Sequence, residues 1–546
     1  MTCGGRMWQK QQNRRGNRPG NQRAQGMTMA VATTHVSIAE VQRSHQDLIS
    51  AEHARAAGDL DGAQRICLGL LDRHPDYVGA LSMLALTHMQ RGAYDQALPL
   101  LVKASMLNPK DWVSLTNAAR AFLKLEAPEC AIRYLEKSLM LKPDEHSTLF
   151  VLGQALMTTQ RYERAAEVLR RACEAGSGES AAPFWLCECY LYLRRYDDAA
   201  EVLMQALQTP SNRDIQAYAY MLASSFPKDI KLDLDILGSL DGLGEPQPED
   251  EEITQFNAAF TRGMCLDGLG RHKEAWDCWV AANAPLKEKY EEQAQTHAEQ
   301  EKELLSICLN WSPREKKPEK EVDKCPPSLF ILGTSRSGRT AMENLVGTLP
   351  GVEMLQEHDL ATSSAQYVSQ HAGLLTTYHL CKLPKELDPV IAEIYRKRLK
   401  ICAGGAGLVT ITHPSAIPDA GRLADFAPNT KFVFMRRNDD DVALRIFGQL
   451  YQENTNQYAY NLNAIYNHIS NYRIMVDNWL EKLGNQAILV NYEEMVSDPE
   501  ATLQRVAKFC GLKPPSKPGL RIEDDSGCAG PYRKWLRAAR DGGNSS

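Results

Sequence analysis

The chain has 546 residues, of which 43% are hydrophobic and 24% charged, and its formal net charge is −6. This length exceeds one hydrophobic core and indicates two to four domains of roughly 150 residues each. The mildly negative charge excludes a protein that binds nucleic acid or an anionic membrane over its whole surface. No apolar run approaches the roughly 20 residues that span a bilayer, and the 14 cysteines lack the spacing of a metal site or a disulfide framework. These features predict a cytoplasmic protein with reduced thiols and no membrane span.

Residues 1–36 form a basic tail with no acidic residue before Glu40. Such a segment has too little apolar surface to order itself. Two interpretations stay open: an arm that touches nucleic acid or anionic lipid, and an unstructured tail or sequence upstream of a start at Met27 or Met29. The second is favoured, so nucleic acid is not the expected partner. The basic residues are Arg6, Lys10, Arg14, Arg15, Arg18 and Arg23.

Residues 37–312 contain an internal repeat with a fixed period. Prolines recur 34 residues apart, and so do alanines that follow a turn. An acidic insertion over residues 244–253 interrupts the pattern, which then returns with an alanine at the same place. Self-similarity at this period predicts stacked helical pairs. The prolines are Pro75, Pro109 and Pro143, and the alanines are Ala63, Ala97, Ala131, Ala165, Ala199 and Ala275.

The repeat resembles the tetratricopeptide repeat, which implies an all-α superhelix over residues 37–312. The concave side of such a superhelix is free to bind a peptide, a partner protein or a second copy of the chain. In an alternative interpretation the superhelix only dimerises or supports the domain behind it. Tyr162, Trp185 and Tyr196 stand at repeat positions and are interpreted as packing residues.

A charged linker over residues 313–325 precedes a different pattern. Residues 326–540 are predicted to form an α/β domain with a central parallel sheet. Its first strand, SLFIL, is followed by the loop GTSRSGRT and by an amphipathic helix. The loop fits the phosphate-loop pattern with arginine in place of lysine. Its backbone N–H groups from Arg336 to Thr340 would converge on an anion at the helix N-terminus, and Gly338 would allow a close approach.

The remaining strands decide which phosphate compound the loop would hold. A magnesium-dependent kinase or ATPase needs an acid at the end of a neighbouring strand. The best central strand, KFVFM, ends instead in Arg436 and Arg437, and the acids at residues 439–441 fall where a helix cap is expected. Two arginines at this edge suit a second phosphate. The sequence therefore predicts a nucleotide with phosphates at two places and no metal, with the magnesium enzyme as a less favoured alternative.

Several ordered motifs resemble the sulfotransferases that use 3′-phosphoadenosine 5′-phosphosulfate (PAPS) and carry tetratricopeptide repeats in front. They include FILGTSRSGRT, LPGVEMLQE, PNTKFVFMRRNDDDVALRIF and ILVNYEEMVSDPE, and the resemblance covers about residue 40 to 540. It implies that Glu357 is the general base, with Glu353 and His358 as alternatives. His413 stands near the position of a family lysine that stabilises the transferring group. The catalytic candidates are Glu357, Arg336 and His413.

The resemblance also implies a set of cofactor-binding residues. Arg437 matches an arginine that grips the 3′-phosphate, and Arg445 replaces a serine with the same role or is an exposed ion-pair residue. Arg339 replaces a family threonine, which adds charge to the loop. Tyr492 lies at the adenine end of the cofactor or is a buried structural tyrosine. The full set is Arg336, Ser337, Gly338, Arg339, Thr340, Arg437, Arg445 and Tyr492.

The expected function is transfer of a sulfuryl group from PAPS to an acceptor hydroxyl, with the repeats positioning the acceptor or a partner. The alternative is a repeat scaffold whose transferase-like domain still binds a nucleotide but has lost turnover, a reading motivated by the departures at Arg339, Arg445 and His413. The acceptor class stays open among sugar, phenol, lipid and metabolite hydroxyls. Residues 360–405 are expected to shape its pocket.

Overall fold

The computed structural model describes most of the chain and divides it into two compact units, residues 1–125 and 126–546. The predicted basic tail and the predicted linker, apart from Pro313, lie outside the described residues, and the expected four-part division stays a prediction. The described residues are 38–125, 127–159, 161–176, 181–208, 213–227, 230–244, 252–313, 326–355, 360–371, 379–427, 429–451, 456–513 and 522–541.

The first unit consists of antiparallel helical pairs. Ala63 and Ala97 are fully buried where paired helices meet, as the period predicts. Asp59 caps the second helix, since its Oδ1 accepts a hydrogen bond of 2.8 Å from the N–H of Gly62. Pro75 follows the end of that helix. The helices are α1 (Ile38–Ala56), α2 (Leu60–Arg73), α3 (Val78–Gln90), α4 (Tyr94–Leu107) and α5 (Trp112–Lys124).

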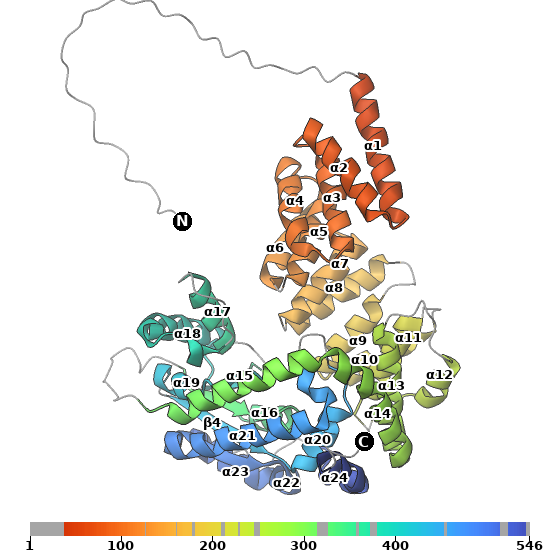
Figure 1. Ribbon diagram of the computed structural model, residues 1–546. Coiled ribbons are helices and arrows are strands. Elements are labelled where there is room, and N and C mark those ends of the chain that lie inside the picture. Colours follow the sequence, from red (N-terminus) through yellow and green to blue (C-terminus); the bar gives the residue numbers. More distant parts are fainter. Residues whose placement is uncertain are drawn as a thin grey trace, which may run out of the picture. The chain divides into compact units, whose positions relative to one another are not determined.

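The second unit begins with more helices of the same kind (Figure 1). Ala131, Ala165, Ala199 and Ala275 are fully buried, which confirms the repeated small position. The helices are α6 (Pro128–Leu141), α7 (His146–Thr158), α8 (Tyr162–Ala175), α9 (Ala182–Tyr192), α10 (Tyr196–Leu207), α11 (Arg213–Ser224), α12 (Ile236–Gly242), α13 (Glu252–Gly268), α14 (His272–Lys289) and α15 (Glu291–Asn310).

The rest of the second unit is an α/β domain around a five-stranded sheet in the order β2-β3-β1-β4-β5. Every pair of neighbouring strands is parallel, and Phe330 of β1 pairs with Ile411 of β3 and with Phe432 of β4. The first strand is thus central, as a buried apolar run predicts. The strands are β1 (Ser328–Leu332), β2 (Val352–Met354), β3 (Leu408–Ile411), β4 (Thr430–Arg436) and β5 (Ala487–Asn491).

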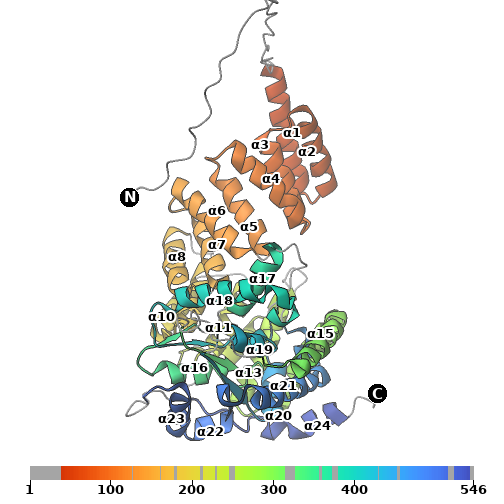
Figure 2. The ribbon, with the colours of Figure 1, turned by 90° about the vertical axis from the view of Figure 1, so that its left-hand side faces the viewer.

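Helices cover both faces of this sheet. Alternate strand residues point to opposite sides, so Phe330 and Phe432 join one apolar cluster while Ile331 and Val433 join another. The first cluster includes side chains of α17, α18, α19 and α21, and the second includes those of α16, α22 and α23. Figure 2 shows these helices in a view turned by 90° from that of Figure 1. The helices are α16 (Arg339–Gly347), α17 (Leu360–His371), α18 (Asp388–Ala403), α19 (Ala420–Phe426), α20 (Asp439–Phe447), α21 (Leu462–Leu483), α22 (Tyr492–Ser497), α23 (Pro499–Cys510) and α24 (Arg533–Asp541).

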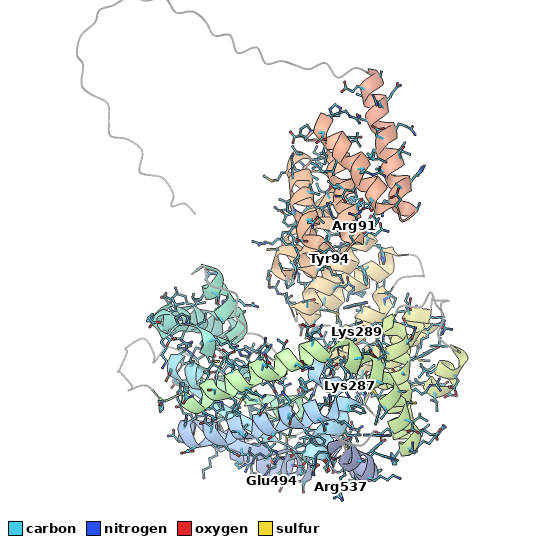
Figure 3. The ribbon with its side chains drawn as sticks, in the orientation of Figure 1. Arg91, Tyr94, Lys287, Lys289, Glu494 and Arg537 are labelled. Carbon is cyan, nitrogen blue, oxygen red and sulfur yellow. The ribbon has the colours of Figure 1, made fainter. Side chains whose placement is uncertain are left out.

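The last repeat helices pack on the α/β domain through aromatic side chains. Trp276 of α14 lies 5.5 Å, between ring centroids, from Phe447 of α20. Trp279 lies 5.8 Å from Tyr532, and Asn283 donates a hydrogen bond of 2.9 Å to the carbonyl of Phe447. The contact between α14 and the α/β domain also positions the start of α15, which follows α14 in the chain. Lys287 and Lys289, labelled in Figure 3, lie in the last turn of α14. Among the described helices, none combines the length and apolar character needed to cross a membrane.

Candidate functional site

The site is built at the carboxyl ends of four neighbouring strands. The phosphate loop follows β1, Thr412 and His413 follow β3, Arg437 follows β4, and Tyr492 follows β5. Because the strands are parallel, these ends share one edge of the sheet, where ligands of open α/β sheets bind. The sheet therefore brings together the predicted site residues that come from all four connections.

The loop between β1 and α16 has the backbone shape of an anion cradle. Arg336 has φ of 63° although it carries a side chain, and Gly338 has φ of 92°. A Cβ atom on Gly338 would lie 2.4 Å from Cδ2 of Tyr492, so only glycine fits there. The hydroxyl of buried Ser337 donates a hydrogen bond of 2.9 Å to the carbonyl of Thr334 and holds the turn closed. Thr340 is exposed in the first turn of α16.

The side chain of Arg339 turns toward the end of β3. Its Nη1 donates a hydrogen bond to the carbonyl of Thr412, and the side chain is buried. Buried Glu343, one turn later, accepts a hydrogen bond of 2.7 Å from Thr410 on the same strand. His413 is half-buried next to Thr412. The replacement of the family threonine thus puts a guanidinium group beside the position where the family lysine is expected.

Arg437 links the loop to the C-terminal segment. Its Nη1 donates a hydrogen bond of 3.1 Å to the carbonyl of Arg336, and its Nη2 lies 2.9 Å from Oδ2 of Asp525. The guanidinium carbon stands 4.3 Å from the centroid of the Tyr492 ring, in cation–π contact. Its buried Nε finds no hydrogen-bond partner among the described residues. Arg437 therefore keeps a donor unused at the cavity wall.

Arg445 binds the same carboxylate in a fork. Its Nε and Nη2 donate hydrogen bonds of 2.8 and 2.6 Å to the two oxygens of Asp525. Its Nη1 donates one of 2.8 Å to Asp267, so Arg445 is a half-buried ion-pair residue that also faces the cavity. Burial tends to raise the pKa of Asp525, but the hydrogen bonds and charges of Arg445 and Arg437 outweigh it and lower that pKa.

Neither Asp525 nor Asp267 was predicted from the sequence as a site residue. Asp525 lies 80 residues and Asp267 178 residues from Arg445, so no local spacing connects them. The only sequence feature that could have indicated this carboxylate is the pair Asp524–Asp525, which follows the last predicted strand. The two arginines assigned to the 3′-phosphate therefore already share one anion, which is a carboxylate of the chain itself.

The three acids after β4 each contact other residues of the chain. Asn438 caps α20, since its side chain accepts hydrogen bonds from the N–H groups of Asp440 and Asp441. The Asp441 carboxylate accepts bonds of 2.7 and 2.8 Å from the N–H groups of Gly527 and Ala529. Asp439 lies 2.5 Å from Nη2 of Arg473. The segment 439–441 thus starts a helix and anchors the C-terminal chain, as the sequence interpretation of a cap region expects.

A cavity of about 1620 Å³ opens over this edge of the sheet. Its wall includes residues of the loop, His413 and both arginines. The repeat helices contribute an aromatic side to it, where the Tyr162 and Tyr192 rings stack with centroids 4.6 Å apart. The repeat aromatics that the sequence analysis interpreted as packing residues, Tyr162, Trp185 and Tyr196, all line this cavity.

The sequence also predicted a general base at Glu357 and an acceptor pocket shaped by residues 360–405. The general-base candidate Glu357 and its neighbour His358 lie outside the described residues. Of the insertion 360–405, the described residue His379 lines the cavity. The assignment of a base therefore stays a sequence-based prediction.

Comparison with known families defines the class of each half of the chain. Residues 54–121 match the tetratricopeptide repeat model, and residues 127–206 match a repeat-containing model described as anaphase-promoting complex, cyclosome, subunit 3. Residues 327–515 match the model described as Sulfotransferase family. The fold and these matches define a helical-repeat protein joined to a transferase-type α/β domain. More particularly, the chain combines tetratricopeptide repeats with a domain of the sulfotransferase family.

Individual relatives are distant. An uncharacterized protein of Aquifex aeolicus (strain VF5) is 23% identical in an alignment of 287 residues that covers 48% of this chain and 36% of that protein. The chain thus spans about a third of the length of the curated relative it matches. A crystal structure of MamA has a TM-score of 0.28 and 22% identity over 29% of this chain and 92% of that one. A crystal structure of YrrB, titled a TPR protein with an unusual peptide-binding site, has a TM-score of 0.27 and 18% identity over 30% of this chain and 84% of that one.

Proposed function

We propose that the protein transfers a sulfuryl group from PAPS to an acceptor hydroxyl in the cavity at the carboxyl edge of the sheet. One observation carries this proposal: the phosphate loop and the paired guanidinium groups of Arg437 and Arg445 line one cavity within a domain of the sulfotransferase family. The donor carries phosphate groups at both ends of its ribose, and this cavity offers an anion cradle and an arginine pair to match them.

The residues present fit such a donor. The loop has no room for a side chain at Gly338, so its backbone can approach an anion closely. Arg437 keeps its buried Nε without a partner among the described residues. Asp525 shows that the guanidinium groups of Arg437 and Arg445 converge on an anion, since both bind its carboxylate. Tyr492, held against Arg437, forms the side of the cavity assigned to the adenine end.

PAPS supplies an activated sulfuryl group whose bond to phosphate breaks as the acceptor oxygen bonds to sulfur. The loop and Arg336 would hold the negative charge of the departing phosphate, which is the main task of such a site. Arg339 and His413, together at the end of β3, would stabilise the transferring group in place of the family lysine. Glu357 would accept the proton of the hydroxyl. A well-placed general base typically raises the rate by about 10²–10⁴-fold.

The repeat helices are assigned the acceptor. Trp185, Tyr192 and Tyr218 line the same cavity as the loop, so a molecule bound against them lies next to the transferring group. Tyr218 donates a hydrogen bond to Glu188, which fixes the ring at the wall. In this arrangement the superhelix contributes directly to the transferase site, and its remaining concave surface is available to a protein or peptide partner.

Calorimetry of the full chain tests the donor assignment. We expect adenosine 3′,5′-bisphosphate to bind with a dissociation constant of about 1–10 µM, on the scale typical of cofactors, and chelators to leave this affinity unchanged. Arg437→Ala should weaken it by roughly 100-fold, which corresponds to about 2.7 kcal/mol for a charged phosphate contact. Preference for magnesium-ATP would remove the proposal.

Turnover separates the enzyme from the inactive scaffold. We expect Glu357→Gln to keep the affinity for adenosine 3′,5′-bisphosphate and to lose sulfuryl transfer from labelled PAPS to a mixed panel of hydroxyl acceptors. Mass spectrometry of the products identifies the acceptor. Donor binding with no transfer to any member of a panel of sugars, phenols, sterols and peptides, in the unmodified chain, would favour the scaffold.

A further inference from the structure

A second group of polar side chains lines the same cavity on the side formed by α15 and α21. His297 and Glu301 stand one turn apart on α15, and His468 stands on α21. A ring nitrogen of each histidine and a carboxylate oxygen of Glu301 lie within 4.8 Å of one another. The two helices pack side by side, as Figures 1 and 2 both show, so the backbone holds the three residues together.

We propose that His297, Glu301 and His468 bind one zinc ion. Two imidazoles and one carboxylate are a ligand set that zinc uses, with a fourth position left for water or a substrate oxygen. Ligand atoms of a tetrahedral zinc site lie roughly 3.3 Å apart. The three side chains must therefore approach by about 1.5 Å at most, which side-chain torsions on fixed helices can provide.

Burial and neighbouring charges shift the pKa values of His297 and Glu301. Burial lowers the pKa of His297, and His468 adds to this effect while Glu301 opposes it. Burial raises the pKa of Glu301, but the hydrogen bond and charge of His468 outweigh it and lower that pKa. A metal needs neutral imidazole and ionised carboxylate. Zn²⁺ would therefore compete with protons for these side chains.

The surrounding residues orient the ligands. Asn471 donates a hydrogen bond of 3.2 Å to Oε2 of Glu301, while Oε1 faces Nδ1 of His468, and the ion would take the place between these two atoms. The buried ring of Tyr458 stacks on both histidines, with centroids 4.9 Å from His297 and 4.2 Å from His468. A flat aromatic surface limits the rotation of both imidazoles, as an outer layer of a metal site does.

A plain ion pair is the competing explanation. His468 donates a hydrogen bond to Glu301, and this pair by itself would satisfy a half-buried carboxylate. In that explanation His297 contributes only its charge interaction with Glu301, and the position of its ring nitrogen within 4.8 Å of the other two ligand atoms is not needed. Variants of His297 therefore distinguish a metal site from an ion pair.

Another group of ligand atoms within reach of one ion consists of His379, Cys381 and Asp419. It is the weaker site, because burial raises the pKa of the Cys381 thiol strongly and keeps it protonated. Variants of His379 and Cys381 therefore serve as a control that tests whether zinc binds to this cysteine-containing group instead.

The zinc proposal does not depend on the proposed sulfuryl transfer.

The test is metal binding by the full chain, purified without a histidine tag and stripped with a chelator. We expect calorimetry to show one equivalent of Zn²⁺ bound with a micromolar or lower dissociation constant. Co²⁺ should give the visible bands of a tetrahedral ion without the near-ultraviolet band of a cobalt–thiolate bond. His297→Ala and Glu301→Gln should each weaken binding by at least about 100-fold, and Asn471→Ala by about tenfold.

The double variant His379→Ala, Cys381→Ser should bind Zn²⁺ as the unmodified chain does. Circular dichroism and urea unfolding check that each variant is folded, and Glu301→Gln keeps the shape and an acceptor for His468. Absence of stoichiometric binding in the unmodified chain would overturn the proposal, and so would unchanged affinity in His297→Ala. Loss of Zn²⁺ binding in the His379→Ala, Cys381→Ser variant would also overturn the proposal, because the ion would then be bound by that group.

Discussion

At the scale of single residues, Asp525 decides the state of the phosphate end of the cavity. It ties together Arg437 and Arg445, which the sequence assigns to a phosphate, and its own N–H lies 3.2 Å from the hydroxyl oxygen of Tyr492. Its carboxylate keeps the two guanidinium groups convergent. It also places a negative charge where a phosphate would bring two more.

Replacing Asp525 by asparagine should strengthen the binding of adenosine 3′,5′-bisphosphate. Like charges about 4 Å apart repel by up to about 4 kcal/mol near a protein surface, and solvent reduces this. We expect a gain of about tenfold in affinity, measured by calorimetry. Asp524→Asn is the matched control, because the substitution removes the same net charge. The carboxylate of Asp524 accepts a hydrogen bond from Ser526 and not from the two arginines. Weaker binding by Asp525→Asn would mean that the carboxylate chiefly positions the arginines for the ligand.

The same carboxylate makes stability depend on pH. The pKa of Asp525 is lowered in the folded protein, so its contribution is complete above the unfolded value of about 3.9 and is lost as pH falls through the folded value. At pH 7 Asp525→Asn should therefore have a lower Tm than the unmodified chain. The difference should shrink below about pH 4 in thermal unfolding followed by circular dichroism. A difference that stays constant down to about pH 2 would exclude this linkage.

At the scale of elements, the sequence predicted what local periodicity encodes. The alanine period located the buried crossings of the repeat helices, and the apolar run SLFIL located a buried strand. The strand expected to be central was KFVFM, whereas β1 holds the middle place in the sheet. Ile465, Tyr472 and Trp479 also follow helical spacing, and these side chains of α21 are buried. Contacts between distant elements escaped the analysis, since His297 and Glu301 carry helical spacing but their partner His468 comes from another helix.

The phosphate loop is the element in which glycine is most constrained. Gly338→Ala should abolish binding of adenosine 3′,5′-bisphosphate in calorimetry, because φ of 92° disfavours a Cβ atom and the ring of Tyr492 leaves no room for one. Gly405→Ala is the control, since Gly405 has φ of 98° but open space around it. Both changes carry the backbone cost of about 1–2 kcal/mol. Comparable binding by the two variants would show that the approach of Tyr492 to the loop is not required.

At the scale of the second unit, repeat helices and the α/β domain together form one cavity. Trp276 and Trp279 pack α14 against α20 and Tyr532, and α15 then runs along α21. In the proposed function, acceptor selection by the repeats and donor binding by the sheet edge would be separable in sequence but would share one cavity. The sequence placed a transferase behind a superhelix, yet only the packing shows that the repeat aromatics line the transferase cavity.

Trp185 tests this shared cavity, because it belongs to α9 and lines the same cavity as the loop that is proposed to hold the donor. Trp185→Leu keeps an apolar side chain and removes the aromatic face, on which a sugar or aromatic acceptor would stack at a gain of about 0.5–1.5 kcal/mol. We expect the KM for the acceptor found in the product panel to rise by about 3–10-fold, with the affinity for adenosine 3′,5′-bisphosphate unchanged. Tyr134→Leu on α6, outside the cavity wall, should change neither value. If Trp185→Leu leaves KM unaltered, or weakens the donor and acceptor alike, the repeats do not select the acceptor and serve as support for the domain behind them.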